Sequence, residues 1–120
     1  MSSRNTLLVV GAAVVVFVLV GAVLIFRNQG GGGTPRTFDV KVTNASSMSP
    51  DHLAAKAGDT ITINITSDKA GEVHLHGYDI AFDTEPGKVA SHTFKADQTG
   101  DFEIEWEDTS KHLGDLAVNP

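Results

Sequence analysis

Five histidines are the residues of this sequence with the clearest capacity for chemistry, because an imidazole can bind a metal ion or carry a proton near neutral pH. Two of them, His74 and His76, are separated by a single residue. In a β-strand, residues i and i+2 point to the same face and lie roughly 6 to 7 Å apart, so both rings can reach one metal ion. The same spacing also suits two polar residues at a strand end, each bonded to backbone or water. Spacing alone therefore leaves a metal site and a metal-free pair both open.

Other kinds of catalytic and metal chemistry are poorly represented in the chain. Its 120 residues include no cysteine, which excludes disulfides, thiolate zinc sites, iron–sulfur clusters and a blue-copper thiolate. Ser91 and His92 are neighbours in a predicted strand, so their side chains point to opposite faces. The sequence also lacks a nucleophile elbow and a phosphate-binding loop. We therefore expect that this chain is not an enzyme.

The distribution of charge argues against nucleic acid as a partner. The chain has 9 basic and 15 acidic residues, giving a formal net charge of -6. Every acidic residue lies at or after Asp39, and the lysines are scattered singly. A surface that binds phosphate backbones needs clustered basic residues. We expect no nucleic-acid binding.

The chain divides into an apolar segment, a tether and one domain. Residues 7–26 contain no charged or strongly polar side chain, and as a helix they would span roughly 30 Å, the thickness of the bilayer hydrocarbon. We expect a single transmembrane helix or signal anchor there, preceded by a short tail at 1–6; a cleaved secretory signal is the alternative. Residues 27–35 are glycine-rich and predict a flexible linker. The domain is expected at 36–120.

The hydrophobic pattern of this domain has the period of two that is typical of strands. Apolar and polar residues alternate over 38–42, 61–65 and 102–106, and good turn sequences separate these runs. The pattern predicts an all-β sandwich. Residues 72–82 read as one further strand, with its core side formed by His74, His76, Tyr78, Ile80 and Phe82. The segment 49–56 is expected to hold at most a helical turn.

Four stretches, taken together, resemble the cupredoxin family along nearly the whole domain. They are Ala-Gly-Asp-Thr-Ile-Thr-Ile at 57–63, Val-His-Leu-His-Gly-Tyr at 73–78, Gly-Asp-Phe-Glu-Ile-Glu-Trp at 100–106, and the segment 112–120. The resemblance implies a Greek-key β-sandwich. It also implies that His76 is the first histidine ligand of a copper site and that Tyr78 is the core aromatic residue that follows it.

The sequence departs from the cupredoxin pattern at the remaining ligand positions. Trp106 occupies the place of the cysteine ligand, the segment 107–111 lacks the second histidine, and His112 occupies the place of the axial methionine. The resemblance therefore implies a site that lacks blue-copper chemistry. It brings His76 and His112 to one end of the sandwich, with His74 as a third imidazole.

Glu107 or Asp108 could add an oxygen ligand to this site. Imidazoles with a carboxylate or water suit Cu(II), and nearly as well Zn(II). The predicted site is therefore a type-2-like copper site.

The other candidate residues have simpler interpretations. His52 is expected to be exposed to solvent, and His92 is expected to pack partly against the sheet. Met48 is predicted to lie in a loop, where a Cu(I) thioether role is a minor alternative. The face formed by Glu103, Glu105 and Glu107 is read as a solvated acidic face, with a weak cation site as the alternative.

Two functional hypotheses follow from the sequence. The first is a membrane-anchored, extracytoplasmic cupredoxin-like domain that binds copper at a His-rich site for storage, sensing or delivery. The second is a metal-free interaction or accessory module at the membrane surface. The expected partners are the membrane, through the N-terminal helix, a metal ion, and a membrane or extracytoplasmic protein. The resemblance and the predicted N-terminal anchor together imply that the domain lies outside the cytoplasm.

Overall fold

The computed structural model of the chain describes residues 33–120. The predicted tail at 1–6, the predicted membrane-spanning segment at 7–26 and most of the predicted linker at 27–35 lie outside the described residues. Within residues 33–120, no helix has both the length and the apolar character needed to cross a bilayer.

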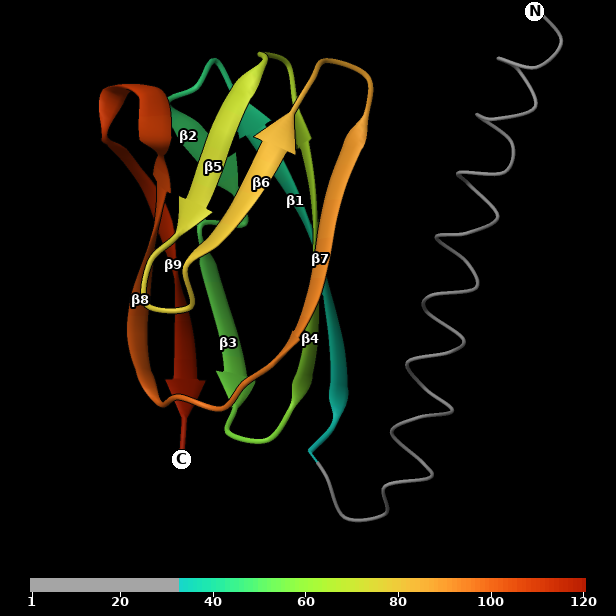
Figure 1. Cartoon of the computed structure of the whole chain (residues 1–120), viewed down its shortest axis with the longest axis vertical. Helices are drawn as coiled ribbons and strands as arrows, with labels where there is room; N and C mark the ends of the chain where they lie inside the picture. The colour runs from blue at the N-terminus through green and yellow to red at the C-terminus, as the bar shows by residue number, and fades with distance from the viewer. Residues whose placement is uncertain (1–32) are drawn as a thin grey trace, which may run out of the picture.

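The described residues form two β-sheets that face each other, as Figure 1 shows. One sheet has the strand order β2-β1-β4-β7 and the other β3-β9-β8-β5-β6. The pairs β1–β4 and β3–β9 are parallel, and the other pairs are antiparallel. The elements are β1 (Pro35–Thr43), β2 (Ser47–Ser49), β3 (His52–Lys56), β4 (Thr60–Ser67), β5 (Gly71–Leu75), β6 (Ile80–Thr84), β7 (Val89–Lys95), β8 (Gly100–Trp106), the 3-10 turn η1 (Glu107–Thr109) and β9 (Lys111–Asn119). The prediction of an all-β sandwich is confirmed.

The core lies between the two sheets and is built from the inward positions of alternating strands. Val40 and Val42 of β1, the three isoleucines of β4, and Ile104 and Trp106 of β8 are all buried. These residues are the apolar positions of the alternating runs from which strands were predicted, so the predicted inward faces of these runs are confirmed. Burial of such side chains is the main force that holds the two sheets together.

The segment 72–82, predicted as one continuous strand, is a β-hairpin. β5 ends at Leu75 and β6 begins at Ile80, and the two strands pair antiparallel. Gly77 and Asp79 in the turn have φ angles of +85° and +56°, a conformation that glycine, asparagine and aspartate adopt more readily than other residues. The chain therefore reverses direction where a straight strand was expected.

This hairpin changes which side of β5 faces the core. Val73 and Leu75 are fully buried, so His74 between them lies on the outer side of the sheet. The prediction that the two histidines share the core side with Phe82 is therefore wrong. Odd-numbered residues of β5 face the core, whereas after the turn the even-numbered residues of β6 do so, among them Phe82.

The segment 49–56 also differs from its prediction. It contains the end of β2 and the whole of β3 instead of a helical turn. Met48, predicted to lie in a loop, is a buried residue of β2 and part of the core. Exposed and buried residues alternate along β3 in the structure, but its sequence has three consecutive apolar residues at 53–55 and therefore lacks the polar–apolar alternation that would predict a strand.

A buried carboxylate fastens the start of β1 to the turn before β4. Asp59 accepts hydrogen bonds from the backbone N–H of Thr34 at 2.7 Å, from the backbone N–H of Lys56 at 2.9 Å, and from Nε of Arg36 at 2.6 Å. Burial by itself raises the pKa of Asp59, but the two backbone N–H groups and the Arg36 guanidinium outweigh it and lower the pKa below its usual value. The carboxylate thereby fixes the point at which the chain enters the domain.

Candidate metal centre

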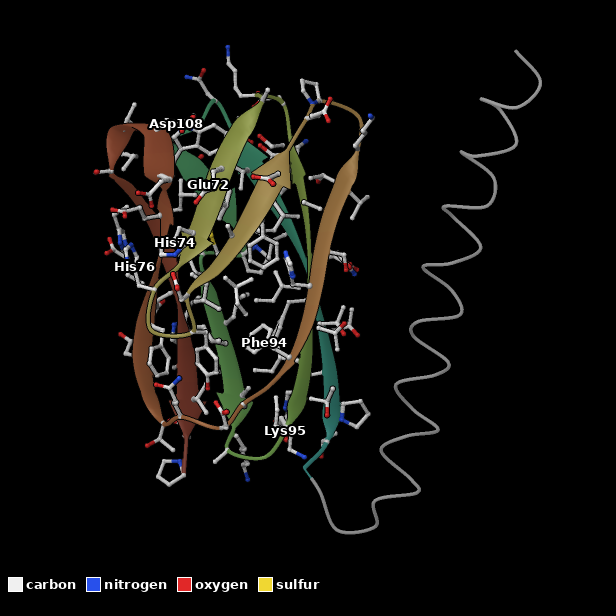
Figure 2. The ribbon with its side chains drawn as sticks, viewed as in Figure 1. Glu72, His74, His76, Phe94, Lys95 and Asp108 are labelled. Carbon is white, nitrogen blue, oxygen red and sulfur yellow. The ribbon has the colours of Figure 1, made fainter. Side chains whose placement is uncertain are left out.

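The candidate metal ligands lie on the outer face of the five-stranded sheet. Strand register places His74 of β5 opposite Glu105 of β8, and Glu105 opposite His112 of β9. Figure 2 shows Glu72 and His74 following one another along β5, with His76 just past the end of the strand, in the hairpin turn. The site is therefore a row of imidazoles and carboxylates across three strands, outside the core.

His74 has one ring nitrogen bonded to protein and one that is not. Its Nε2 lies 2.9 Å from Oδ1 of Asp79. A carboxylate only accepts hydrogen bonds, so Nε2 is the donor, and in the tautomer that this bond selects Nδ1 carries the lone pair. Nδ1 is buried, has no hydrogen-bond partner among the described residues, and lies 3.6 Å from Oε1 of Glu107. A buried lone pair beside a carboxylate is an arrangement suited to a cation.

His76 is held in the same way by a different carboxylate. Its Nε2 donates to Oε1 of Glu105 at 2.6 Å, and its backbone N–H donates to the carbonyl of Glu103 at 2.9 Å. The hydrogen bond to Glu105 raises the pKa of His76 above its usual value, and the negative charges of Glu105, Glu103 and Glu107 add to this shift, whereas burial opposes it. The His74 and His76 ring centroids are 4.5 Å apart, with the rings nearly perpendicular.

These side chains form two overlapping donor sets. His74, His76 and Glu107 each offer a ligand atom within 4.8 Å of the others, and so do His76, Glu103 and Glu105. His76 belongs to both sets. Three donors at such distances can close around one ion with small rotations of the side chains, because Cu(II) and Zn(II) bond to nitrogen and oxygen at about 2 Å.

The structure brings together some of the predicted ligands and leaves others apart. His74, His76 and Glu107 form one donor set, as the sequence suggested they could. His112 belongs to neither set, and its Nδ1 donates instead to Oε2 of Glu103 at 2.9 Å. Asp108 also belongs to neither set; it lies in η1, and Figure 2 shows it beyond Glu72, away from the two histidines.

Sequence reasoning missed the carboxylates that orient the rings. A continuous strand over 72–82 would place Asp79 on the face opposite His74, and the alternating glutamates of 103–107 predict a solvated acidic face. The alternation of glutamates in β8 correctly predicts that they lie on an outer face. Which side chains of other strands lie next to them depends on strand pairing, and the sequence alone does not give that pairing. The signal that could have found Asp79 is the glycine at position 77, because a turn there returns the chain toward His74.

The remaining predictions for single residues are settled by their contacts. His52 is exposed, as expected, and its Nδ1 donates to Asp115 at 2.9 Å. His92 of β7 contacts the Phe82 ring edge-to-face at a centroid distance of 4.9 Å, which agrees with its predicted packing. Trp106, at the position of the missing cysteine ligand, is a core residue whose ring covers Gly71.

The donor chemistry fits an ordinary nitrogen and oxygen site. Two imidazoles and one or two carboxylates suit Cu(II) and Zn(II), and they leave coordination positions open because the ligands lie on a sheet surface. The buried Trp106 supplies no thiolate, so a blue-copper centre does not fit these residues. An ion here would be held by His74 and His76 and by a carboxylate from β8 or η1.

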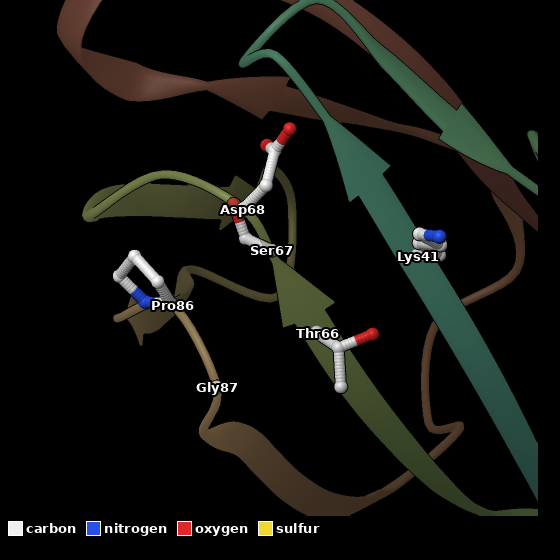
Figure 3. A pocket seen from close by; sticks show the side chains of 6 residues that line it. All are labelled: Lys41, Thr66, Ser67, Asp68, Pro86 and Gly87. Atoms are coloured by element: carbon white, nitrogen blue, oxygen red, sulfur yellow. The ribbon is translucent and has the colours of Figure 1, made fainter.

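A separate hollow lies on the other side of the sandwich. It has a volume of about 340 Å³ and is lined by Lys41, Thr66, Ser67, Asp68, Pro86 and Gly87, as Figure 3 shows. None of its lining residues is a histidine, and it shares no residue with either donor set. It is therefore independent of the candidate metal centre.

No model of a protein family matches the sequence, and no curated protein matches it. Among solved structures, a copper-binding protein in its apo form matches with a TM-score of 0.59 at 14% identity, over 74% of this chain and 99% of that one. A laccase from Botrytis aclada matches with a TM-score of 0.61 at 18% identity, over 74% of this chain and 23% of that one.

A third match extends further along the chain. A chain in the structure of a heme-copper terminal oxidase dimer matches with a TM-score of 0.58 at 12% identity, over 98% of this chain and 99% of that one. At these identities the comparisons establish the fold. Together with the two-sheet topology, they show that the described part of this chain has a cupredoxin-like fold.

Proposed function

We propose that this chain is a membrane-anchored domain that binds one Cu(II) ion through His74, His76 and Glu107 in an extracytoplasmic compartment, for copper storage, sensing or delivery. The observation that carries the proposal is the buried Nδ1 of His74, which has no hydrogen-bond partner among the described residues and lies beside His76 and Glu107. A buried polar atom without a partner costs free energy, and a metal ion is a partner that would remove this cost.

The carboxylates behind the rings support the same proposal. Asp79 and Glu105 each accept a hydrogen bond from one ring nitrogen. In metal sites this arrangement fixes the tautomer and the orientation of a ligating histidine and raises its basicity. The two histidines are therefore arranged as ligands would be before a metal arrives.

Copper is favoured over zinc for two reasons. Nitrogen-rich sites bind Cu(II) more tightly than Zn(II) in the usual order of metal affinities. Two of the structurally similar proteins are named as a copper-binding protein and a laccase. The site has no thiolate, so the expected centre is type-2-like, with His112 or Glu103 as further ligands after side-chain rotation.

The experiment is a Cu(II) titration of the full chain in detergent, followed by calorimetry and by electron paramagnetic resonance (EPR). We expect one equivalent bound with a nitrogen-rich type-2 spectrum, and we expect that His74→Ala and His76→Ala each abolish it. His52→Ala is the matched control, because His52 also lies on this sheet face and pairs with a carboxylate but belongs to neither donor set. Binding that survives both ligand substitutions would refute the proposed site.

A second function is supported by a different observation. Each of the four histidines on this face already has a carboxylate partner, so the face can exist without metal. The match to a chain of a heme-copper terminal oxidase dimer covers nearly the whole of both chains. The alternative is therefore a metal-free accessory module that binds a membrane protein. It predicts that the same titration detects no copper.

A further inference from the structure

The outer face of the five-stranded sheet is strongly and unevenly charged. Strand register and burial place six carboxylates at its outward positions, and we call this surface the acidic face: Glu72, Asp83, Asp101, Glu103, Glu105 and Asp115. Lys56, at the end of β3, and Lys111, at the start of β9, are the exposed lysines of these described strands, and both lie at strand ends. Across residues 33–120, none of the six carboxylates forms a salt bridge with lysine or arginine.

Two pairs of these carboxylates lie directly opposite each other. Glu72 of β5 faces Asp83 of β6, and Glu103 of β8 faces Asp115 of β9. Like charges in directly opposed positions destabilise a sheet. The carboxylate pair at β5 and β6 also has no histidine among its hydrogen-bonded neighbours. The acidic face is therefore maintained at a cost in stability.

The outer face of the other sheet lacks this charge. Its outward positions on β1, β4 and β7 are mainly threonine, serine and asparagine, and the charged residues among them are Asp39, Lys41 and Lys95. The acidity of the chain is thus concentrated on the side that holds the candidate metal centre. A protein approaching from solution would experience an attractive or repulsive field that depends on which face it meets.

We propose that the acidic face is the docking surface for a positively charged protein that exchanges copper with the centre formed by His74, His76 and Glu107; this rests on the proposed function of that centre. Glu72 lies two residues before His74 on β5 and opposite Asp83 of β6. A partner whose basic residues contact these two carboxylates would therefore hold its own metal site close to His74. Complementary charge mainly raises the rate of association and fixes its orientation, by roughly 10- to 1,000-fold in rate. The occupant is a protein whose metal site is surrounded by lysine or arginine.

The docking surface can be tested without copper. Hexaamminechromium(III) is an inert paramagnetic trication that broadens the NMR signals of residues near which it collects. Added to the metal-free full chain in neutral detergent, it should broaden amides of β5, β6 and β8 selectively, and this selectivity should fall as salt is raised. Equal broadening over β1, β4 and β7 would overturn the inference, because it would show no preference between the two faces.

Two variants distinguish the effect of the acidic face from the effect of the net charge of the protein. In the double variant Glu72→Gln/Asp83→Asn, neither residue belongs to a donor set, and broadening of β5 and β6 should fall by at least half. Asp39→Asn is the matched control on the opposite sheet, and it should leave the broadening of β5 and β6 unchanged. Equal effects of the double variant and the control would also overturn the inference.

The copper exchange is tested with two matched donors. Cu(II) is supplied on peptides that share one His-Gly-His site and end in four lysines or in four glutamines. At low salt we expect transfer from the lysine peptide to be about tenfold faster or more, with the ratio reduced in the double variant and preserved in Asp39→Asn. Equal rates from both donors would overturn the docking inference, whereas no transfer from either, with the chromium map intact, would overturn the proposed copper site alone.

Discussion

The hydrogen bond from His74 to Asp79 gives a quantitative test of how the candidate centre is organised. Asp79→Asn removes the negative charge but keeps an oxygen that can accept the hydrogen bond from Nε2. Asparagine also tolerates the φ of +56° at this position, so the turn should be preserved. The variant therefore changes the support of the ring while leaving the ring and the hairpin in place.

The expected magnitude follows from the exposure of the carboxylate. Loss of such a supporting carboxylate typically weakens metal binding by about 10- to 100-fold. The Asp79 side chain is 92% exposed, so water screens its charge and the effect should lie near the lower limit. Glu105, which supports His76, has a side chain that is only 13% exposed, and Glu105→Gln should have the larger effect. A tenfold change corresponds to about 1.4 kcal/mol.

The assay combines affinity with a direct view of the ring. Calorimetry of Cu(II) binding gives the dissociation constant, and the 15N chemical shifts of His74 report which nitrogen carries the proton in the metal-free chain. We expect the wild-type ring to be protonated at Nε2, and the Asp79→Asn ring to be a mixture of tautomers. If Asp79→Asn left both the tautomer and the dissociation constant unchanged, the reasoning about ring orientation would be refuted.

Three further predictions concern the stability of the fold. The lowered pKa of Asp59 stabilises the folded state above the unfolded pKa of about 4, and this contribution is lost as pH falls through the folded pKa. The difference in unfolding free energy between wild type and Asp59→Asn, measured by urea titration, should therefore shrink as pH falls below about 4. A difference that stays constant over this pH range would contradict the prediction. Gly71→Ala should destabilise the domain by about 1 to 3 kcal/mol, because the added methyl group would overlap the Trp106 ring; an unchanged urea midpoint would show that the ring can move aside. Leu75→Ala should cost about 2 to 5 kcal/mol because Leu75 is fully buried, whereas Val89→Ala, at a residue that is 56% exposed, should change the unfolding free energy by less than about 0.5 kcal/mol; similar losses in these two variants would mean that β5 does not face the core.

Much of the fold could be predicted from local patterns. Alternation in 61–65 and 102–106 identified β4 and β8 and their buried sides, because the period of a strand is a property of the backbone and needs no knowledge of its neighbours. The same rule failed at 72–82, where apolar residues continued across a turn. Gly77 marked that turn, but a single glycine within an alternating pattern does not distinguish a hairpin from an irregular strand.

The candidate site also has features that the sequence predicts and features that depend on strand pairing. The amino-acid types and the spacing of His74 and His76 were sufficient to predict that both rings share a face and could share a metal ion, and the absence of cysteine excluded a blue-copper site. The partners of these rings come from other strands. Glu105 lies 29 residues from His76, and its position depends on the register between β5 and β8.

The sequence by itself therefore determined the strand content, the donor chemistry and the acidity of the chain. Tertiary structure decided that the histidines face outward, that Glu107 joins them while His112 pairs with Glu103, and that the negative charge is concentrated on one sheet. The physical reason is that side-chain type and strand period are local, whereas strand pairing and the direction of a hairpin are set by packing between residues far apart in the chain.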